Sequence, residues 1–494
     1  MWYSRHSGIL LHPTSLPGEG GIGSFGREAI AFIDFLKAAG QSLWQILPLG
    51  PTGYGNSPYS CYSAFAGNPL LINLEKLVEA GDLKKKDTVA SFPTDKVDYE
   101  AVIAFKSSIL KKAAASFFAK AESSRKEAFW NFCDSTFWLH DYALFMVLRE
   151  YFGEESWNNW PSALVKRDPV TCKEYSDKLG EDIGFQKYMQ WQFYTQWSEV
   201  KAYANNLGIK IIGDAPIFVA YDSVDVWCNQ QIFRLDKDGL PLVVAGVPPD
   251  YFSSTGQRWG NPHYNWDNLA LDGYNWWLAR IGNDLALYDI VRIDHFRGFE
   301  AAWTIPASEK TAIKGEWVKG PGDKLFEAVR AKFGNLPIIA EDLGIITPEV
   351  EAIRDKFSLP GMKILQFAFE GGAVNAYLPH NHILNSVVYT GTHDNDTTLG
   401  WFSGLDTEKQ QLICDYLNCK NDGLLESMIR VAVGSVARYA ILPMQDVLSL
   451  GSSARMNIPG TSAGNWGWRM GKDSIAPALA ERLKHLAIIY GRTS

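Results

Sequence analysis

The stretch DIVRIDHFRGF, residues 289–299, begins as an apolar run and ends in charged residues followed by a glycine. This pattern is typical of a buried parallel strand with polar side chains at its C-terminal end. Side chains alternate along a strand, so Arg292 and Asp294 share one face of the predicted strand. A guanidinium beside a carboxyl group favours the charged carboxylate. Asp294 is therefore a candidate nucleophile, although a structural salt bridge explains this stretch equally well when it is taken alone.

Apolar runs of strand length recur along the chain, each ending in polar, glycine or proline residues. There are eight of them: residues 8–13, 42–48, 209–218, 289–298, 336–344, 362–370, 385–394 and 439–446. Helical patterns lie between them, and one is predicted to start with Pro348 directly after Thr347. Strands that alternate with helices favour a parallel sheet, and eight such units predict a closed (β/α)8 TIM barrel of the α/β class. An open doubly wound sheet is the alternative.

Two intervals are too long for simple connections between barrel strands. Residues from about 50 to 207 have mostly helical patterning, and residues from about 219 to 288 are rich in loops and tryptophan. We interpret both as large insertions on the C-terminal face, where TIM-barrel active sites lie. No linker or internal repeat marks a second domain, so residues 1–494 are interpreted as one catalytic domain without a C-terminal β-domain.

Residues 246–262 have the composition of an active-site lid. Two prolines stiffen the start of this segment, and two glycines near its end permit bending. Tyr251, Phe252 and Trp259 offer flat faces that can stack on the apolar faces of ligand rings. So many large aromatic residues are not typical of an ordinary surface loop.

Acidic residues end three of the predicted strands: Asp294 ends the fourth, Glu341 and Asp342 end the fifth, and Asp394 ends the seventh. One acid after a barrel strand is commonly a helix N-cap, but capping does not explain three that converge on one rim. Adjacent strands lie about 4.8 Å apart, which suits the carboxyl separation of about 5 to 5.5 Å in retaining glycosidases. Asp294 would attack the anomeric carbon. Glu341, its pKa raised by the charge on Asp294 and a dry site, would protonate the leaving oxygen.

The composition excludes several other classes of function. The chain has 47 basic and 55 acidic residues, a net charge of −8 and no long like-charge block, so no nucleic-acid partner is expected. Six scattered cysteines without a C-x-x-C pair indicate reduced thiols. Neither a signal peptide nor an apolar run of about 20 residues is evident, so we expect a cytoplasmic protein without membrane contact.

Two further motifs are rejected. GIGSFG, residues 21–26, matches G-x-G-x-x-G but lacks a strand directly before it and an acid about twenty residues later, so no dinucleotide cofactor is expected. His12, His263, His295 and His393 lack metal-ligand spacing and more plausibly donate hydrogen bonds to sugar hydroxyls or are satisfied within the structure. No metal is predicted, and a metal-dependent hydrolase, which a chelator would inactivate, is a minor alternative.

A set of longer motifs follows one another in a characteristic order. They are SGILLHPTSLP (7–17), WQILPLGPTG (44–53) with Ser57-Pro-Tyr59, GDAP (213–216), PPDYF to WGNP (248–262), RIDHFRG (292–298), AEDLG (340–344), GTHDND (391–396), NIPGT (457–461) and Asn465-Trp466. On these motifs the sequence resembles, nearly from end to end, the amylomaltases or 4-α-glucanotransferases (disproportionating enzymes), which are relatives of the α-amylases.

The resemblance implies roles for individual residues. Asp294 would be the nucleophile, Glu341 rather than Asp342 the general acid/base, and Asp394 the acid that stabilises the transition state by binding ring hydroxyls. The implied substrate-binding residues are Ser57, Tyr59, Asp214, Arg292, His393 and Asn465 for the donor, and Gln257 and Trp259 for the acceptor. The resemblance implies no cofactor.

The expected activity is transfer of a segment of an α-1,4-glucan to the 4-hydroxyl of glucose or of another α-1,4-glucan, by a retaining double displacement. An α-amylase-like glucan hydrolase is the alternative, because the carboxylates alone do not separate transfer from hydrolysis. A glucan-binding protein without chemistry is a second rival, and the intact set of three acids argues against it.

Overall fold

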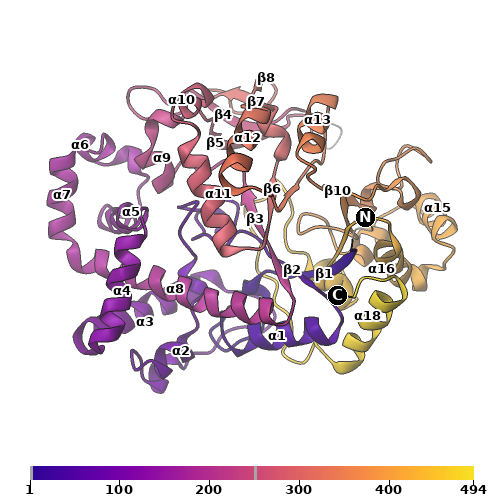
Figure 1. The fold of residues 1–494 in the computed structure, drawn as a ribbon, viewed down its shortest axis with the longest axis horizontal. Helices are drawn as coiled ribbons and strands as arrows, with labels where there is room; N and C mark the ends of the chain where they lie inside the picture. The colour runs from indigo at the N-terminus through magenta and orange to yellow at the C-terminus, as the bar shows by residue number, and fades with distance from the viewer. Residues whose placement is uncertain (1–3, 250–252, 494) are drawn as a thin grey trace.

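The computed structural model describes residues 4–249 and 253–493. Eight parallel strands close a barrel in the order β1-β2-β3-β6-β9-β10-β11-β12 (Figure 1). They are β1 (His6–Leu10), β2 (Leu43–Gln45), β3 (Lys210–Pro216), β6 (Ile290–Asp294), β9 (Ile338–Ala340), β10 (Gly361–Ile364), β11 (Ser386–Tyr389) and β12 (Tyr439–Pro443). Each overlaps one of the eight predicted runs, so the predicted TIM barrel is confirmed.

Amphipathic helices surround the barrel. They include α1 (Arg27–Ala38), α8 (Gly180–Asn206), α11 (Asn275–Leu287), α12 (Asp323–Phe333), α13 (Pro348–Lys356), α16 (Leu424–Gly434) and α18 (Pro477–Ile489). Helix α1 buries Phe32 and Leu36, one turn apart, and contacts both α8 and α18. Helix α13 begins at Pro348 after Thr347, as predicted. Phe32 of α1 meets the Trp44 ring of β2, with centroids 5.2 Å apart, so the buried face of α1 packs on the barrel wall.

The chain between β2 and β3 is helical. Helices α2 (Leu74–Glu79), α3 (Tyr99–Lys120), α4 (Ser123–Ser135), α5 (Leu139–Tyr151), α6 (Ser162–Val165) and α7 (Pro169–Lys178) precede α8, and α3 to α7 project to one side of the barrel in Figure 1. Helix α8 packs against α3, α4 and α5 but also against α1 and β3. Helix α8 therefore joins the predicted helical insertion to the barrel.

A second, four-stranded antiparallel sheet has the order β5-β4-β7-β8. Its strands are β4 (Val243–Val247), β5 (Gln257–Pro262), β7 (Ala301–Pro306) and β8 (Glu316–Lys319). Within the predicted insertion at residues 219–288 lie β4, β5, α9 (Val224–Cys228), α10 (Trp266–Leu271) and α11, joined by loops. Strand β5 is polar and contains Gly260, so its strand conformation depends on pairing with β4 rather than on local propensity.

After β12 the described residues form helical segments and loops that end in α18, without a further strand. None of the helices within residues 4–249 and 253–493 combines the length and apolar character that crossing a membrane requires.

Candidate active site

Asp294 and Glu341 leave neighbouring barrel strands at the same level. Strands β6 and β9 are parallel, with Ile293 opposite Ala340, and the two acids follow this pair directly. The Glu341 amide donates to the Ile293 carbonyl at 3.0 Å. Because paired strands lie about 4.8 Å apart, this register suits the carboxyl separation of about 5 to 5.5 Å in retaining glycosidases.

The half-buried Glu341 carboxyl is bound by two backbone donors. Its Oε2 accepts a hydrogen bond from the His295 amide at 2.6 Å, and its Oε1 accepts one from the Leu343 amide at 3.1 Å. Burial and then the charge on Asp294 raise the pKa of Glu341, Arg292 and the two backbone donors oppose the shift, and the net pKa is about 8. Glu341 is therefore protonated at neutral pH, as a general acid must be.

The neighbouring acid, Asp342, serves the fold instead. Its Oδ2 accepts from Arg354 Nη1 at 2.6 Å, and its Oδ1 accepts from the Met362 amide at 2.7 Å. These contacts tie the end of β9 to α13 and β10. Consecutive residues of a strand point to opposite faces, so only Glu341 faces the barrel mouth.

Arg292 links two acids on adjacent strands. Its Nη2 donates to Asp294 Oδ1 at 2.9 Å, so the predicted ion pair is present, and its Nη1 donates to Asp214 Oδ2 at 2.6 Å. The Tyr59 hydroxyl also donates to Asp214 Oδ2, at 2.7 Å. Burial raises the pKa of Asp214, and Arg292 opposes the shift.

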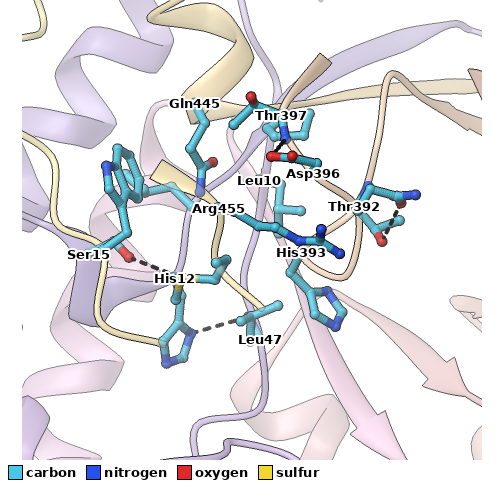
Figure 2. A pocket seen from close by; sticks show the side chains of 15 residues that line it. Leu10, His12, Ser15, Leu47, Thr392, His393, Asp396, Thr397, Gln445 and Arg455 are labelled. Atoms are coloured by element: carbon cyan, nitrogen blue, oxygen red, sulfur yellow. Dashed lines mark hydrogen bonds between the residues drawn. The ribbon is translucent and has the colours of Figure 1, made fainter. Parts of the chain in front are cut away.

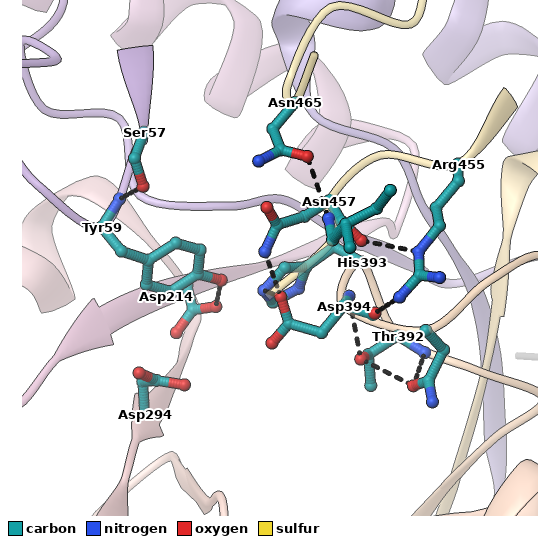
Figure 3. Close-up of polar contacts among 12 residues, drawn as sticks. Ser57, Tyr59, Asp214, Asp294, Thr392, His393, Asp394, Arg455, Asn457 and Asn465 are labelled. Atoms are coloured by element: carbon teal, nitrogen blue, oxygen red, sulfur yellow. Dashed lines mark hydrogen bonds and ion pairs between the residues drawn. The ribbon is translucent and has the colours of Figure 1, made fainter. Parts of the chain in front are cut away.

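His393 and Asp394 follow β11 and lie across the mouth from Asp294 (Figure 3). The Tyr59 ring stacks on the His393 ring, with centroids 5.0 Å apart and an interplanar angle of 16°. Burial raises the pKa of Tyr59, and the charges on Asp214, Asp294 and Asp394 all raise it further. Acids that follow or end three barrel strands therefore lie close enough to Tyr59 to affect its pKa.

Sequence reasoning missed two contacts of Asp394. Asn457 Nδ2 donates to Asp394 Oδ1 at 2.6 Å, and Arg455 Nη2 donates to the Asp394 carbonyl at 2.7 Å. Asn457 lies in the quoted NIPGT motif, but nothing in that motif indicates a partner 63 positions away. The only signal for Asn457 in the sequence was its place in a motif that follows the eighth predicted strand.

A small cavity of about 30 Å³ lies between His12 and the loop that carries His393 (Figure 2). His12 Nδ1 accepts a hydrogen bond from the Leu47 amide at 3.3 Å. Burial lowers the pKa of His12 to about 3, so the ring is neutral. These contacts fit the interpretation that His12 has its hydrogen-bond partner within the protein rather than on a sugar.

Gln257 and Trp259 lie on β5, and Trp259 Nε1 donates to Gln257 Oε1 at 3.2 Å. The Trp259 ring meets the His295 ring edge to face, with centroids 4.8 Å apart, so β5 reaches the residue after Asp294. The two ends of the predicted lid thus belong to strands β4 and β5, which pair with each other. Its expected stacking residues Tyr251 and Phe252 lie outside the described residues.

Ser57 and Asn465 make local contacts. Ser57 Oγ accepts from the Tyr59 amide at 3.2 Å, so it supports the position of Tyr59. Asn465 Nδ2 donates to the Thr461 carbonyl at 3.0 Å, and its Oδ1 accepts from the Ile458 amide at 2.9 Å. In this structure the Asn465 amide is therefore bonded within its own loop, and the structure does not bring it into contact with the acids.

Across the two described ranges, no cluster of three or more His, Cys, Asp or Glu side chains is arranged to hold a metal ion.

The sequence was compared with known proteins. Residues 11–474 match the model of a family described as 4-alpha-glucanotransferase. The chain belongs to the 4-alpha-glucanotransferase family. The 4-alpha-glucanotransferase of Thermus thermophilus is 51% identical, over 98% of this chain and 98% of that protein. The Synechocystis enzyme of the same name is 52% identical, over 99% of this chain and 98% of that protein.

A solved structure agrees with these relatives. The amylomaltase from Streptococcus agalactiae, in complex with acarbose, superposes with a TM-score of 0.97 at 41% identity, covering 99% of this chain and 100% of that one. The resemblance and the 4-α-glucanotransferase activity predicted from the sequence are confirmed, and the hydrolase alternative is not favoured.

Proposed function

We propose that this 4-alpha-glucanotransferase transfers glucan segments through a covalent ester on Asp294. Asp294 Oδ1 is bound by Arg292, while Oδ2 has no hydrogen bond to any described residue and belongs to a side chain that is 30% exposed. That oxygen attacks the anomeric carbon of an α-1,4-linked donor. Glu341 protonates the departing 4-oxygen, and the reducing part of the donor leaves.

In the second step, Glu341 acts as a base on the 4-hydroxyl of glucose or of another glucan. The hydroxyl attacks the ester, and two inversions give net retention. Asp394 is proposed to bind ring hydroxyls in the transition state, with Tyr59, Asp214, Arg292 and His393 holding the donor sugar. The observation that carries this proposal is that Glu341 and the arginine-paired Asp294 directly follow paired residues of adjacent strands.

Transfer exceeds hydrolysis if the acceptor is held in line and water is excluded. Gln257 and Trp259 are proposed to line the acceptor side, since the contact of Trp259 with His295 brings β5 next to the nucleophile. The proposed substrates are α-1,4-glucans and maltooligosaccharides, with glucose as an acceptor. The scattered cysteines of the sequence support a location in the reducing cytoplasm.

Incubation with maltotriose alone tests the activity. Glucose and chains longer than maltotriose are expected to appear together, because each cleavage is matched by a transfer. Added glucose should shift the products toward shorter chains without an increase in total reducing ends. Only shorter sugars and a steady rise in reducing ends would instead indicate an α-amylase-like hydrolase.

Donor cleavage should also depend on the ionisation of Glu341. Its pKa is raised to about 8, so the acid form is abundant below that pH and is lost above it. Because cleavage requires the proton, we expect kcat/KM to fall about tenfold per pH unit above roughly pH 8.5. Initial rates at subsaturating maltotriose from pH 5 to 10 measure this limb. A profile that stays flat to pH 10 would contradict the role of Glu341 as the acid.

A further inference from the structure

The Asp394 carboxylate has one short contact with a side chain outside its own loop. The Asp394 side chain is 47% exposed, and its Oδ1 accepts a hydrogen bond from Asn457 Nδ2 at 2.6 Å. Its Oδ2 has no hydrogen bond to a described residue. We propose that Asn457 is a positioning residue that aims the Asp394 carboxylate at the donor sugar. This inference rests on the proposed function, in which Asp394 binds ring hydroxyls.

The backbone on both sides of this contact is fixed by one guanidinium. Arg455 Nε donates to the Asn457 carbonyl at 2.8 Å, and Arg455 Nη2 donates to the Asp394 carbonyl at 2.7 Å. The planar, rigid fork of arginine holds two acceptors in a set geometry. The Asn457 amide therefore reaches Asp394 from a backbone that is itself held relative to it, as Figure 3 shows.

The loop that carries Asp394 is anchored at both ends by a different residue. The buried Asp446 carboxylate accepts from Thr390 Oγ1 at 2.6 Å, where β11 ends, and from the Thr398 amide at 2.7 Å, where α14 (Thr398–Ser403) begins. Asp446 thus fixes the course of the backbone. What remains free is the rotation of the Asp394 side chain, and Asn457 restricts that rotation.

No other described side chain replaces this donor. His393 Nε2 lies 3.4 Å from Asp394 Oδ1, beyond ordinary hydrogen-bond length, and its ring is held in the stack with Tyr59. An amide is also the suitable donor, because it orients a carboxylate without neutralising it. Asp394 keeps its acceptor capacity, and Oδ2, which has no hydrogen bond to a described residue, is available for a sugar hydroxyl.

Asn457→Asp and Asn457→Ala test this inference through kcat relative to the wild type at each pH from 5.5 to 8.5. In Asn457→Asp at pH 8 the new carboxylate repels Asp394. The ratio of the kcat of this variant to that of the wild type should then be about 0.01 or less. The charge on Asp394 should raise the pKa of the new carboxyl, so that it becomes protonated as the pH falls. The protonated carboxyl can donate a hydrogen bond to Asp394, and the ratio should therefore recover at least about tenfold by pH 5.5. Asn457→Ala should lose about 10- to 100-fold with little dependence on pH.

Asn159→Asp is the matched control. Asn159 is exposed at the end of a short helical turn, and its Oδ1 accepts from Asn158, which a carboxylate also permits. This variant adds the same charge in the helical region between β2 and β3, where it has no contact with Asp394, and should keep kcat within about twofold of the wild type at every pH. Melting temperatures at pH 5.5 and 8 show whether each variant is folded under assay conditions.

A purely structural role for Asn457 would make the losses follow the melting temperature and leave the Asn457→Asp ratio independent of pH. That result, or an Asn457→Ala enzyme with kcat within twofold of the wild type, would overturn the inference. Asp394→Asn separates this outcome from failure of the proposed function. If Asp394→Asn stays active, the role of Asp394 is wrong, and the inference that rests on it is overturned as well. If Asp394→Asn is inactive but Asn457→Asp shows no recovery in acid, only the inference fails.

Discussion

Asp294→Asn is expected to lower kcat for glucan transfer by roughly 10⁴-fold or more, while the fold and glucan binding persist. A neutral amide cannot form the ester with the anomeric carbon. The shape of the side chain is kept, and Arg292 retains its second partner, Asp214, at 2.6 Å. Glucose release from maltotriose measures kcat, and calorimetric titration with a maltooligosaccharide measures binding.

Asp289→Asn is the matched control for this variant. Asp289 directly precedes the N-terminal end of β6, whereas Asp294 lies at its C-terminal end. Asp289 Oδ2 accepts from the Ile211 amide at 2.7 Å, a bond that an asparagine oxygen can also accept. We expect kcat of Asp289→Asn to stay within a few-fold of the wild type. If Asp294→Asn is as active as this control, Asp294 is not the nucleophile.

Glu341→Gln is expected to lower kcat/KM for maltooligosaccharides by roughly 10²- to 10⁴-fold, because the departing 4-oxygen loses its proton donor. Glutamine can accept only one of the two backbone N–H bonds that Glu341 accepts, from His295 and Leu343. Circular dichroism should therefore accompany the kinetics.

An activated donor distinguishes loss of the acid from loss of the site in Glu341→Gln. Fluoride leaves without a proton from the enzyme, so α-maltosyl fluoride should still form the ester on Asp294 at a rate close to that of the wild type. Breakdown of the ester needs Glu341 as a base and should become slow. If the variant reacts no faster with the fluoride than with maltotriose, Glu341 is not the general acid.

The barrel could be predicted from the sequence because its strands are buried on both faces. Such strands are continuous apolar runs, and their polar ends mark the rim where active-site residues gather. Arg292 and Asp294 alternate with apolar residues within one run, so their pairing could be read directly. Asp214 was expected at the donor sugar only by resemblance, and its hydrogen bond to Arg292 across β3 and β6 was not predicted.

The features that could not be predicted from the sequence depend on contacts between residues that are distant along the chain. Alternation places only one of Glu341 and Asp342 in the barrel mouth, and the hydrogen bond from Arg354 in α13 shows that Asp342 is the one on the other face. Local sequence does not contain that information. Likewise, β5 becomes a strand only through pairing with β4, and Asn457 gains its significance only beside Asp394.

The covalent ester can be observed directly. Glu341→Gln treated with α-maltosyl fluoride, quenched in acid and digested should yield a peptide containing Asp294 that is heavier by one maltosyl residue, with fragmentation placing the added mass on Asp294. An unmodified Asp294 peptide alongside a maltosyl group on any other residue would contradict the proposed double displacement.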